Sequence, residues 1–404
     1  MTSETNEIPV SRPTDSVRPT AEKSEPKHFD YIDALRGVAF LIVLLYHCLG
    51  AVQGLPMGFA AVVNKGNYGV QLFYVASAFT LFLSLDQRSK LDRRPVLFFF
   101  IRRFFRIAPM FWAAIIFYVV IWGLGPRSAA PYGIGVWHIL STFFFLHGWH
   151  PTTINSVVPG GWSIAVEMVF YALVPVFFFH ARTLKRMVPI FGILLVVSRL
   201  ASWGVTRWLS HAMAPIYQEC VKSFAYYWLP AQLPVFCMGF ILYILLTDYY
   251  PPAPRTMDSA DRRRGGLLLV GAGLLSAVLI RFKVPAAYLG FGVVSALVAF
   301  SLAYRPNAIL VNRFTRYAGK VSYSGYLMHF FVVDELRDFL PRMAFLQSIP
   351  ALVRYFIFVG VATAGTLLFA TITYQFVEKP GRNIGRRVIQ HLKARPVGAD
   401  AMRR

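Results

Sequence analysis

Acidic residues and cysteines are scarce in this sequence of 404 residues. Asp and Glu number 19 against 41 Lys and Arg, and charged residues together make up only 15% of the chain. The three cysteines, Cys48, Cys220 and Cys237, form no regularly spaced set and no CxxC pair. The sequence therefore predicts neither a disulfide framework nor a zinc site, and we expect no bound metal.

The sequence also has no internal repeat and no segment typical of a cleaved leader. Its first 33 residues are polar and rich in Pro, Ser and Thr. They contain neither the apolar core nor the small-residue cleavage site of a signal peptide. We therefore expect residues 1–30 to form a disordered cytoplasmic tail.

Hydrophobic residues, in contrast, are abundant: they make up 56% of the chain, and aromatic residues make up 16%. Such a composition does not suit a single water-soluble core. Ten apolar runs approach the roughly 20 residues that cross about 30 Å of hydrocarbon. These runs are 34–52, 68–85, 109–125, 162–180, 188–205, 225–246, 266–280, 285–304, 321–340 and 351–376. The sequence predicts an all-α, polytopic membrane helix bundle of about ten transmembrane helices.

An eleventh apolar segment, Val136 to Trp149, is shorter, and its length favours a re-entrant or interfacial segment. If it does not cross, both termini are cytoplasmic, and 30 of the 41 Lys and Arg lie on the cytoplasmic side against 7 on the other. This arrangement satisfies the positive-inside rule, whereas a crossing would place Arg182 to Arg186 outside. The net charge of +22 then follows from membrane orientation, so we expect no nucleic-acid partner. Residues 381–404 are expected to form a basic cytoplasmic tail.

The first apolar run, "LRGVAFLIVLLYHCLG", carries Arg36 near its start and His47 well inside it. Eleven helical residues make about three turns, so the two side chains share one face about 16 Å apart along the axis. Contact with lipid phosphate or with Asp33 would explain Arg36, and a hydrogen bond to a neighbouring helix would explain His47. Ionisable residues at membrane depth also mark functional sites, and this alternative stays open.

Other ionisable residues lie near the ends of later runs. Arg103 and Arg106 share a helix face at the start of the third run, where they either anchor the helix or bind phosphate groups. Glu167 lies inside the fourth run and needs a partner or a proton. Glu378 and Pro380 follow the last run, and we expect them to cap and stop its helix.

Five motifs in order make the sequence resemble the acyltransferase-3 family of integral membrane acyltransferases. They are "YIDALRGVAFLIVLLYH", "LFYVASAFTLF", "IRRFFRIAPMFW", "WSIAVEMVFYALVP" and "VSYSGYLMH", and the resemblance runs from about Tyr31 to Arg387. We place the membrane domain at residues 31–380. Two positions depart from the family pattern: Ala78 replaces a glycine, and Met168 replaces the second of two paired glutamates.

The resemblance implies transfer of an acyl group, most often acetyl from cytoplasmic acetyl-CoA, to a hydroxyl of a glycan such as a surface polysaccharide. It also implies a multi-pass protein of the bacterial cytoplasmic (inner) membrane that holds no cofactor permanently. Its motifs indicate two sets of residues. The catalytic residues would be His47 and Glu167, and the substrate-binding residues would be Arg36, Arg103, Arg106, Ser77, Trp162, Tyr323 and His329.

In this interpretation the arginines hold the phosphates of coenzyme A, and His47 exchanges a proton between the acceptor hydroxyl and the thiolate. Glu167 would orient the imidazole or bind acceptor hydroxyls. Alternatively His47 is itself acylated, or Cys48 is the nucleophile. A transporter or flippase without acyl-transfer chemistry is the competing class, because buried His, Glu and Arg also build substrate pathways. A membrane scaffold without catalytic activity is a third class.

Overall fold

A computed structural model describes residues 30–251, 259–339, 343 and 348–394. Within these residues the chain is all-α and contains no β-strand, which confirms the predicted fold class. The expected N-terminal tail, residues 1–30, lies outside the described residues apart from Asp30. The same holds for the last ten residues of the basic tail.

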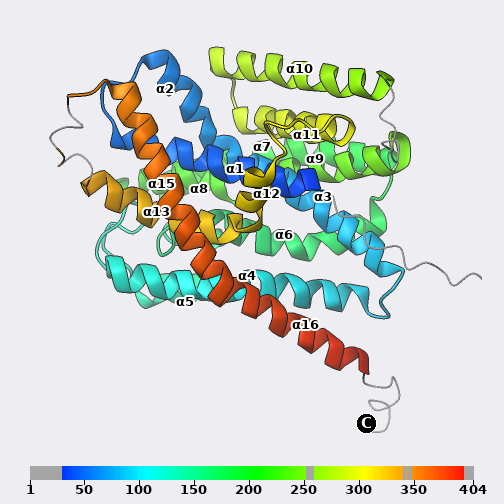
Figure 1. The fold of residues 1–404 in the computed structure, drawn as a ribbon. Helices are drawn as coiled ribbons and strands as arrows, with labels where there is room; N and C mark the ends of the chain where they lie inside the picture. The colour runs from blue at the N-terminus through cyan, green and yellow to red at the C-terminus, as the bar shows by residue number, and fades with distance from the viewer. Residues whose placement is uncertain (1–29, 252–258, 340–342, 344–347, 395–404) are drawn as a thin grey trace, which may run out of the picture.

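Most helices of the bundle run roughly parallel to one another across the view of Figure 1. Nine helical stretches of the described chain are long and apolar enough to cross a membrane. Their main helices are α1 (Asp30–Cys48), α3 (Gly69–Ser89), α4 (Pro95–Trp122), α6 (Gly161–His180), α7 (Leu184–Ala212), α9 (Leu229–Ile244), α10 (Ser259–Arg281), α11 (Ala287–Tyr304) and α15 (Ala351–Thr373). Shorter helices connect them: α2 (Met57–Asn64), α5 (Val136–Phe143), α8 (Gln218–Tyr227) and α12 (Arg313–Lys320).

The ninth expected span, residues 321–340, is helical over Ser322–Phe339 but is not among the nine. It corresponds to α13 (Ser322–Phe339), whose last two turns carry Asp334, Glu335, Arg337 and Asp338. These charges shorten its apolar part, although its first half is buried in the bundle. The chain thus has nine clear spanning candidates and one helix that is apolar only over part of its length.

The short apolar segment Val136 to Trp149 forms α5, a helix of eight residues, followed by a loop and a short 3₁₀ turn. Eight residues rise only about 12 Å, well short of the hydrocarbon thickness. The segment lies against α4, where the indole Nε1 of Trp112 donates to the carbonyl of Phe143 at 3.0 Å. Its length agrees with an interfacial or re-entrant segment.

Helix α1 crosses α12 at very short range through two glycines. A Cβ at Gly37 would lie 2.0 Å from the carbonyl oxygen of Thr315, and one at Gly319 would lie 1.8 Å from the carbonyl oxygen of Asp33. No larger residue fits at either position without separating the helices. This contact positions Arg36, the neighbour of Gly37.

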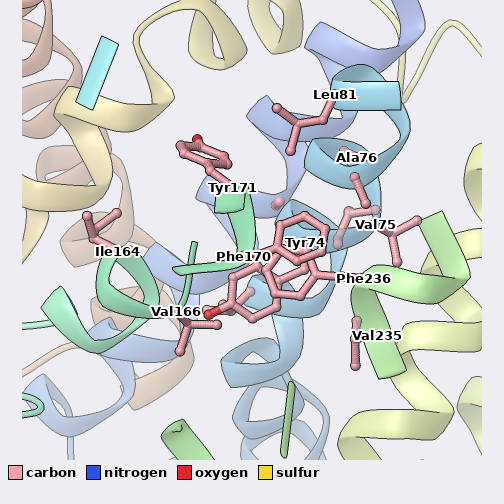
Figure 2. Packing of buried hydrophobic residues seen from close by; sticks show 14 of the residues in the cluster. Tyr74, Val75, Ala76, Leu81, Ile164, Val166, Phe170, Tyr171, Val235 and Phe236 are labelled. Atoms are coloured by element: carbon pink, nitrogen blue, oxygen red, sulfur yellow. The ribbon is translucent and has the colours of Figure 1, made fainter. Parts of the chain in front are cut away.

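The core between α3, α6 and α9 is built from stacked aromatic rings (Figure 2). The ring of Phe236 stacks on Tyr74 at 4.2 Å and on Phe170 at 3.8 Å between centroids. Such pairs stabilise beyond the burial of their area. Because Ser77 lies on α3 and Glu167 on α6, this packing also sets the distance between those two side chains.

The prediction that Glu378 and Pro380 stop the last helix is wrong. Helix α15 continues through a π-helical turn, Tyr374–Glu378, directly into α16 (Lys379–Ala394), which runs away from the bundle in Figure 1. Pro380 directly follows the π-helical turn, and a proline and a π-helical turn are features at which a continuous helix can bend. Helix α16 packs closely on α4, since a Cβ at Gly381 would lie 2.6 Å from Pro109 and one at Gly385 would lie 2.7 Å from Phe105. Residues 381–394 are therefore a packed helix.

Candidate active site

A small cavity of about 40 Å³ lies between α1, α3, α6 and α13. Arg36, Ser77, Glu167 and Tyr323 all line it, so the structure brings four of the predicted site residues together. The hydroxyl of Ser77 donates to Glu167 Oε1 at 2.6 Å, and the hydroxyl of Tyr171 donates to the same oxygen at 2.7 Å. The volume holds only a few water molecules or one narrow chain.

Positive charge dominates the surroundings of this cavity. Arg36 interacts electrostatically with Glu167 and with Arg106, and Arg106 also interacts with Glu378. Glu378 is 1% exposed and accepts a hydrogen bond from Ser324 Oγ at 3.0 Å. The two carboxylates therefore offset part of the arginine charge, which makes burial of these guanidiniums tolerable.

A second, larger cavity of about 470 Å³ opens beside Arg103 and Arg106. It is strongly basic: eight of its lining side chains are cationic, namely Arg88, Arg102, Arg103, Arg106, Lys379, Arg382, Arg386 and Lys393. Arg102 Nη2 and Arg103 Nε are buried and have no hydrogen-bond partner among the described residues. Guanidinium groups with unused donors around one cavity are suited to a ligand with several phosphates.

His47 lies at the other end of α1, beside His329 of α13. Their ring centroids are 5.1 Å apart, and both rings contact Phe330. His329 is fully buried, and its Nδ1 lies 2.7 Å from the carbonyl oxygen of Tyr326. Because a carbonyl only accepts, Nδ1 carries the hydrogen and Nε2 presents a lone pair in the neutral imidazole. Nε2 has no partner within the described part of the chain.

Tyr326 connects the small cavity to the histidine pair. It lines the cavity, and its ring lies 5.7 Å from the ring of His329. Its hydroxyl receives a hydrogen bond from Ser163 Oγ at 3.0 Å and lies 3.2 Å from the carbonyl of Gly160. Gly160 has a φ of +71°, and a Cβ there would lie 2.8 Å from Phe330. This glycine lets the loop before α6 close over Tyr326 and Phe330.

The predicted residues thus fall into three groups. Arg103 and Arg106 belong to the basic cavity, and four others line the small cavity. His47 and His329 form a pair farther along α1 and α13. Trp162 belongs to none of these groups, because it stacks on Tyr227 at 4.4 Å and does not line either cavity.

Glu167 was expected to orient the imidazole of His47 or to bind acceptor hydroxyls, and its observed hydrogen bonds do not involve His47. Its hydrogen-bond partners are Ser77 and Tyr171, at the Arg36 end of α1. Sequence reasoning missed Tyr171, Glu378 and the cations of α16. Tyr171 lies four residues after Glu167, so the helical period offered a signal for this pair. The sequence contained no such signal for Glu378, because the burial of Glu378 depends on a helix that was expected to stop.

The loop before α6 is held by two polar side chains. Arg127 donates to the carbonyls of Ser156 and Val157 at 3.0 and 2.8 Å. The ring of His147 stacks on Phe111, and its Nε2 lies 3.0 Å from the carbonyl of Gly161. Burial lowers the pKa of the His147 imidazole to about 4, so it stays neutral at physiological pH. Both residues position the start of α6 and with it Glu167.

The fold and these three groups define a polytopic membrane protein with a basic cavity, a small polar cavity and an imidazole pair. The chain belongs to the acyltransferase-3 family: the model of that family, described as an acyltransferase domain, matches residues 29–373. This finding confirms the resemblance found in the sequence motifs and the prediction of a membrane acyltransferase.

Several curated proteins are similar to this chain. A Staphylococcus aureus (strain COL) protein named "Putative O-acetyltransferase" is 27% identical over 90% of this chain and 58% of its own length. The peptidoglycan O-acetyltransferase OatA of Listeria monocytogenes is 25% identical over 89% of this chain and 56% of its own. The exopolysaccharide production protein ExoZ of Rhizobium meliloti is 27% identical over 44% of this chain and 56% of its own. The matches thus span less than two thirds of these relatives. No solved structure matches the chain significantly.

Proposed function

We propose that this protein transfers an acetyl group from cytoplasmic acetyl-CoA to a hydroxyl of a surface polysaccharide. The observation that carries this proposal is the order of the three groups, from the basic cavity through the small polar cavity to the histidine pair. Family membership supports acyl transfer, and the names of the relatives support O-acetylation of a glycan.

The basic cavity suits the donor. Coenzyme A is a polyanion with a long thin arm that ends in the thioester, and a carrier of this kind needs its phosphates held away from its reactive end. Arg103 and Arg106 line the large cavity and approach the charges around Arg36 and Glu167. The phosphates would bind in the large cavity while the arm enters the small cavity past Arg36.

The helix α1 sets the distance that this arm must cover. Arg36 and His47 are eleven residues apart on one helix, which is about 16 Å. Phe330 and Tyr326 surround the path near the histidines, so the thioester would react away from bulk water. Exclusion of water favours transfer to the acceptor over hydrolysis.

In the transfer step the acceptor oxygen attacks the thioester carbonyl, a carbon–oxygen bond forms and the carbon–sulfur bond breaks. His47 takes the hydroxyl proton and returns it to the leaving thiolate. The neighbouring His329 has its Nδ1–H held by Tyr326, so its Nε2 is positioned to accept a hydrogen bond from His47 or from the acceptor. Alternatively, His47 attacks the thioester, carries the acyl group transiently and passes it to the acceptor hydroxyl, so that the overall reaction is the same.

The orientation follows from charge. The basic cavity and the ends of the helices that carry it would lie in the cytoplasm, where acetyl-CoA is made, and His47 nearer the other side, where the glycan is presented. The protein would then reside in the bacterial cytoplasmic membrane with both termini inside.

Purified protein in detergent tests the proposal. Radiolabelled acetyl-CoA should transfer its acetyl group to a polysaccharide fraction, and the glycan should gain the mass of one acetyl group per site. Acetyl-CoA turnover should rise when the acceptor is added. A transporter or flippase, the competing class, would leave acetyl-CoA intact with or without acceptor, and that result would reject the proposal.

A further inference from the structure

We infer that helix α16 forms one wall of the donor site and that Arg386 binds the outermost phosphate of coenzyme A, the 3′-phosphate of its adenosine. This inference rests on the proposed function, because it assumes an acyl-CoA donor. Helix α16 lies beyond residues 29–373, which the acyltransferase domain model matches, and its cations from Arg382 onward were expected to belong to a basic tail.

Half of the cations around the basic cavity come from this helix. Lys379, Arg382, Arg386 and Lys393 all lie on α16, and the other four lie on α3 and α4. The side chain of the adjacent Arg387 is exposed and does not line the cavity. The basic residues of α16 therefore divide into a set that faces the cavity and one that does not.

Helix α16 is held in place against the bundle. Besides the close packing of Gly381 and Gly385 on α4, Lys393 Nζ lies 2.5 Å from Asp92 Oδ1. The same carboxylate lies 3.4 Å from Arg102 Nη1, so Asp92 joins α16 to α4 and to the α3–α4 connection. A helix fixed at both ends can present its cations at defined positions, whereas a solvated tail cannot.

The cations of the cavity form an inner and an outer tier. Arg103 and Arg106 interact electrostatically with Glu167, which lines the small cavity, so they form the inner tier. Arg386 is exposed, and it donates a hydrogen bond to the neutral side chain of Asn383. It has no ion-pair partner among the described residues, while Arg382 lies 3.9 Å from Glu378. Arg386 therefore offers an uncompensated charge in the outer tier.

The structure of coenzyme A matches these tiers. Its diphosphate joins the pantetheine arm to the adenosine, and the 3′-phosphate lies farther from the thioester. If the thioester points toward the small cavity, the diphosphate meets Arg103 and Arg106 and the 3′-phosphate meets Arg386. Phosphate groups of anionic lipids present the same chemistry to Arg386, so the test must separate the two sources.

The test compares coenzyme A with dephospho-coenzyme A, which lacks the 3′-phosphate, by calorimetry on the full-length protein in detergent. Loss of a charge-assisted contact should cost about tenfold in affinity. We expect Arg386→Gln to weaken coenzyme A about tenfold and to leave dephospho-coenzyme A unchanged. The matched control Arg387→Gln, one residue along, should change neither affinity.

Three other outcomes have distinct meanings. Equal weakening of both nucleotides by Arg386→Gln, or no weakening, would overturn the inference while leaving the proposed function standing. Loss of bound phosphatidylglycerol in native mass spectrometry of Arg386→Gln, with an unchanged preference for coenzyme A, would assign the site to lipid. Failure of the unmodified protein to bind either nucleotide would reject the acyl-CoA donor itself.

Discussion

His47 and His329 differ in burial and in hydrogen bonding. His329 is fully buried and its Nδ1 is held by a backbone carbonyl, whereas His47 is partly exposed and touches Tyr46, His329 and Phe330 through its ring. Within the described residues no hydrogen bond fixes the imidazole of His47, so its ring nitrogens stay open to an acceptor hydroxyl, which suits a group that exchanges a proton.

The first prediction concerns His47→Gln. Removal of a general base typically slows a reaction by about 10²- to 10⁴-fold. Glutamine keeps a hydrogen-bonding amide but cannot exchange a proton at neutral pH. We expect acetyl transfer to fall by that range while the affinity for coenzyme A stays the same. His211→Gln, an exposed histidine bonded only to the backbone of its own helix, is the matched control. Near-normal transfer by His47→Gln would leave the residue a packing role.

A second prediction separates the charge of Glu167 from its hydrogen bonds. Glutamine retains an oxygen for Ser77 and Tyr171 but removes the charge that balances Arg36 and Arg106, so Glu167→Gln should lower transfer and also lower the melting temperature. Glu167→Ala should lower stability further than Glu167→Gln, by about 1–3 kcal/mol for each hydroxyl left unpaired. Thermal melting with Glu335→Ala, an exposed acid, as control tests this. Equal melting of the Gln and Ala proteins would contradict it.

At this scale the sequence predicted which residues lie near one another better than it predicted the contacts of each. Arg36, Ser77, Glu167 and Tyr323 meet at one cavity, as a shared site requires. The bond from Ser77 to Glu167 was not predictable, because a contact across helices depends on their rotation and not on spacing within one helix. Trp162 was expected at the site and instead packs on Tyr227.

Among the elements, α16 departs most from expectation. The lengths of the apolar runs predicted the spanning helices, because length and hydrophobicity are direct signals. A proline and a basic run after the last span suggested a helix end, yet a π-helical turn carries the chain on. The signal that remained was Gly381 and Gly385, four residues apart, a spacing typical of close helix packing.

Asp92 gives a prediction at the scale of this element. Burial alone would raise the pKa of its carboxyl, but the hydrogen bond and charge of Lys393, together with the charge of Arg102, lower that pKa below its usual value of 3.8. The ion pair therefore contributes fully at neutral pH, and its contribution is lost only as the pH falls through the lowered value. We expect Asp92→Asn to speed hydrogen exchange in α16, by the same factor between about pH 5 and pH 8.

The control for this measurement is Asp261→Asn, which removes an acid near Arg264 on α10 and should leave exchange in α16 unchanged. Unaltered exchange in Asp92→Asn would mean that glycine packing alone holds the helix. A dependence on pH within that range would mean that another group, not Asp92, controls it.

The molecule as a whole has an asymmetric charge distribution. The basic cavity, α16 and the α3–α4 connection carry a concentration of positive charge, and the histidine pair lies at the opposite end of α1. If the protein is oriented with the basic end in the cytoplasm, donor and acceptor approach the same buried path from opposite sides. That arrangement makes topology part of the mechanism.

The last prediction tests this topology by labelling introduced cysteines in intact cells. All three native cysteines are buried, and we would first replace them to give a background without thiols. Arg94→Cys and Arg262→Cys should be shielded from a membrane-impermeant thiol reagent, and Ser128→Cys should label; all three positions are exposed. Permeabilised cells should label all three, which controls for accessibility. Labelling of Arg262→Cys but not of Arg94→Cys in intact cells would mean that an odd number of crossings lies between them. Because α5 lies in that interval and has only eight residues, the expected result is shielding at both positions.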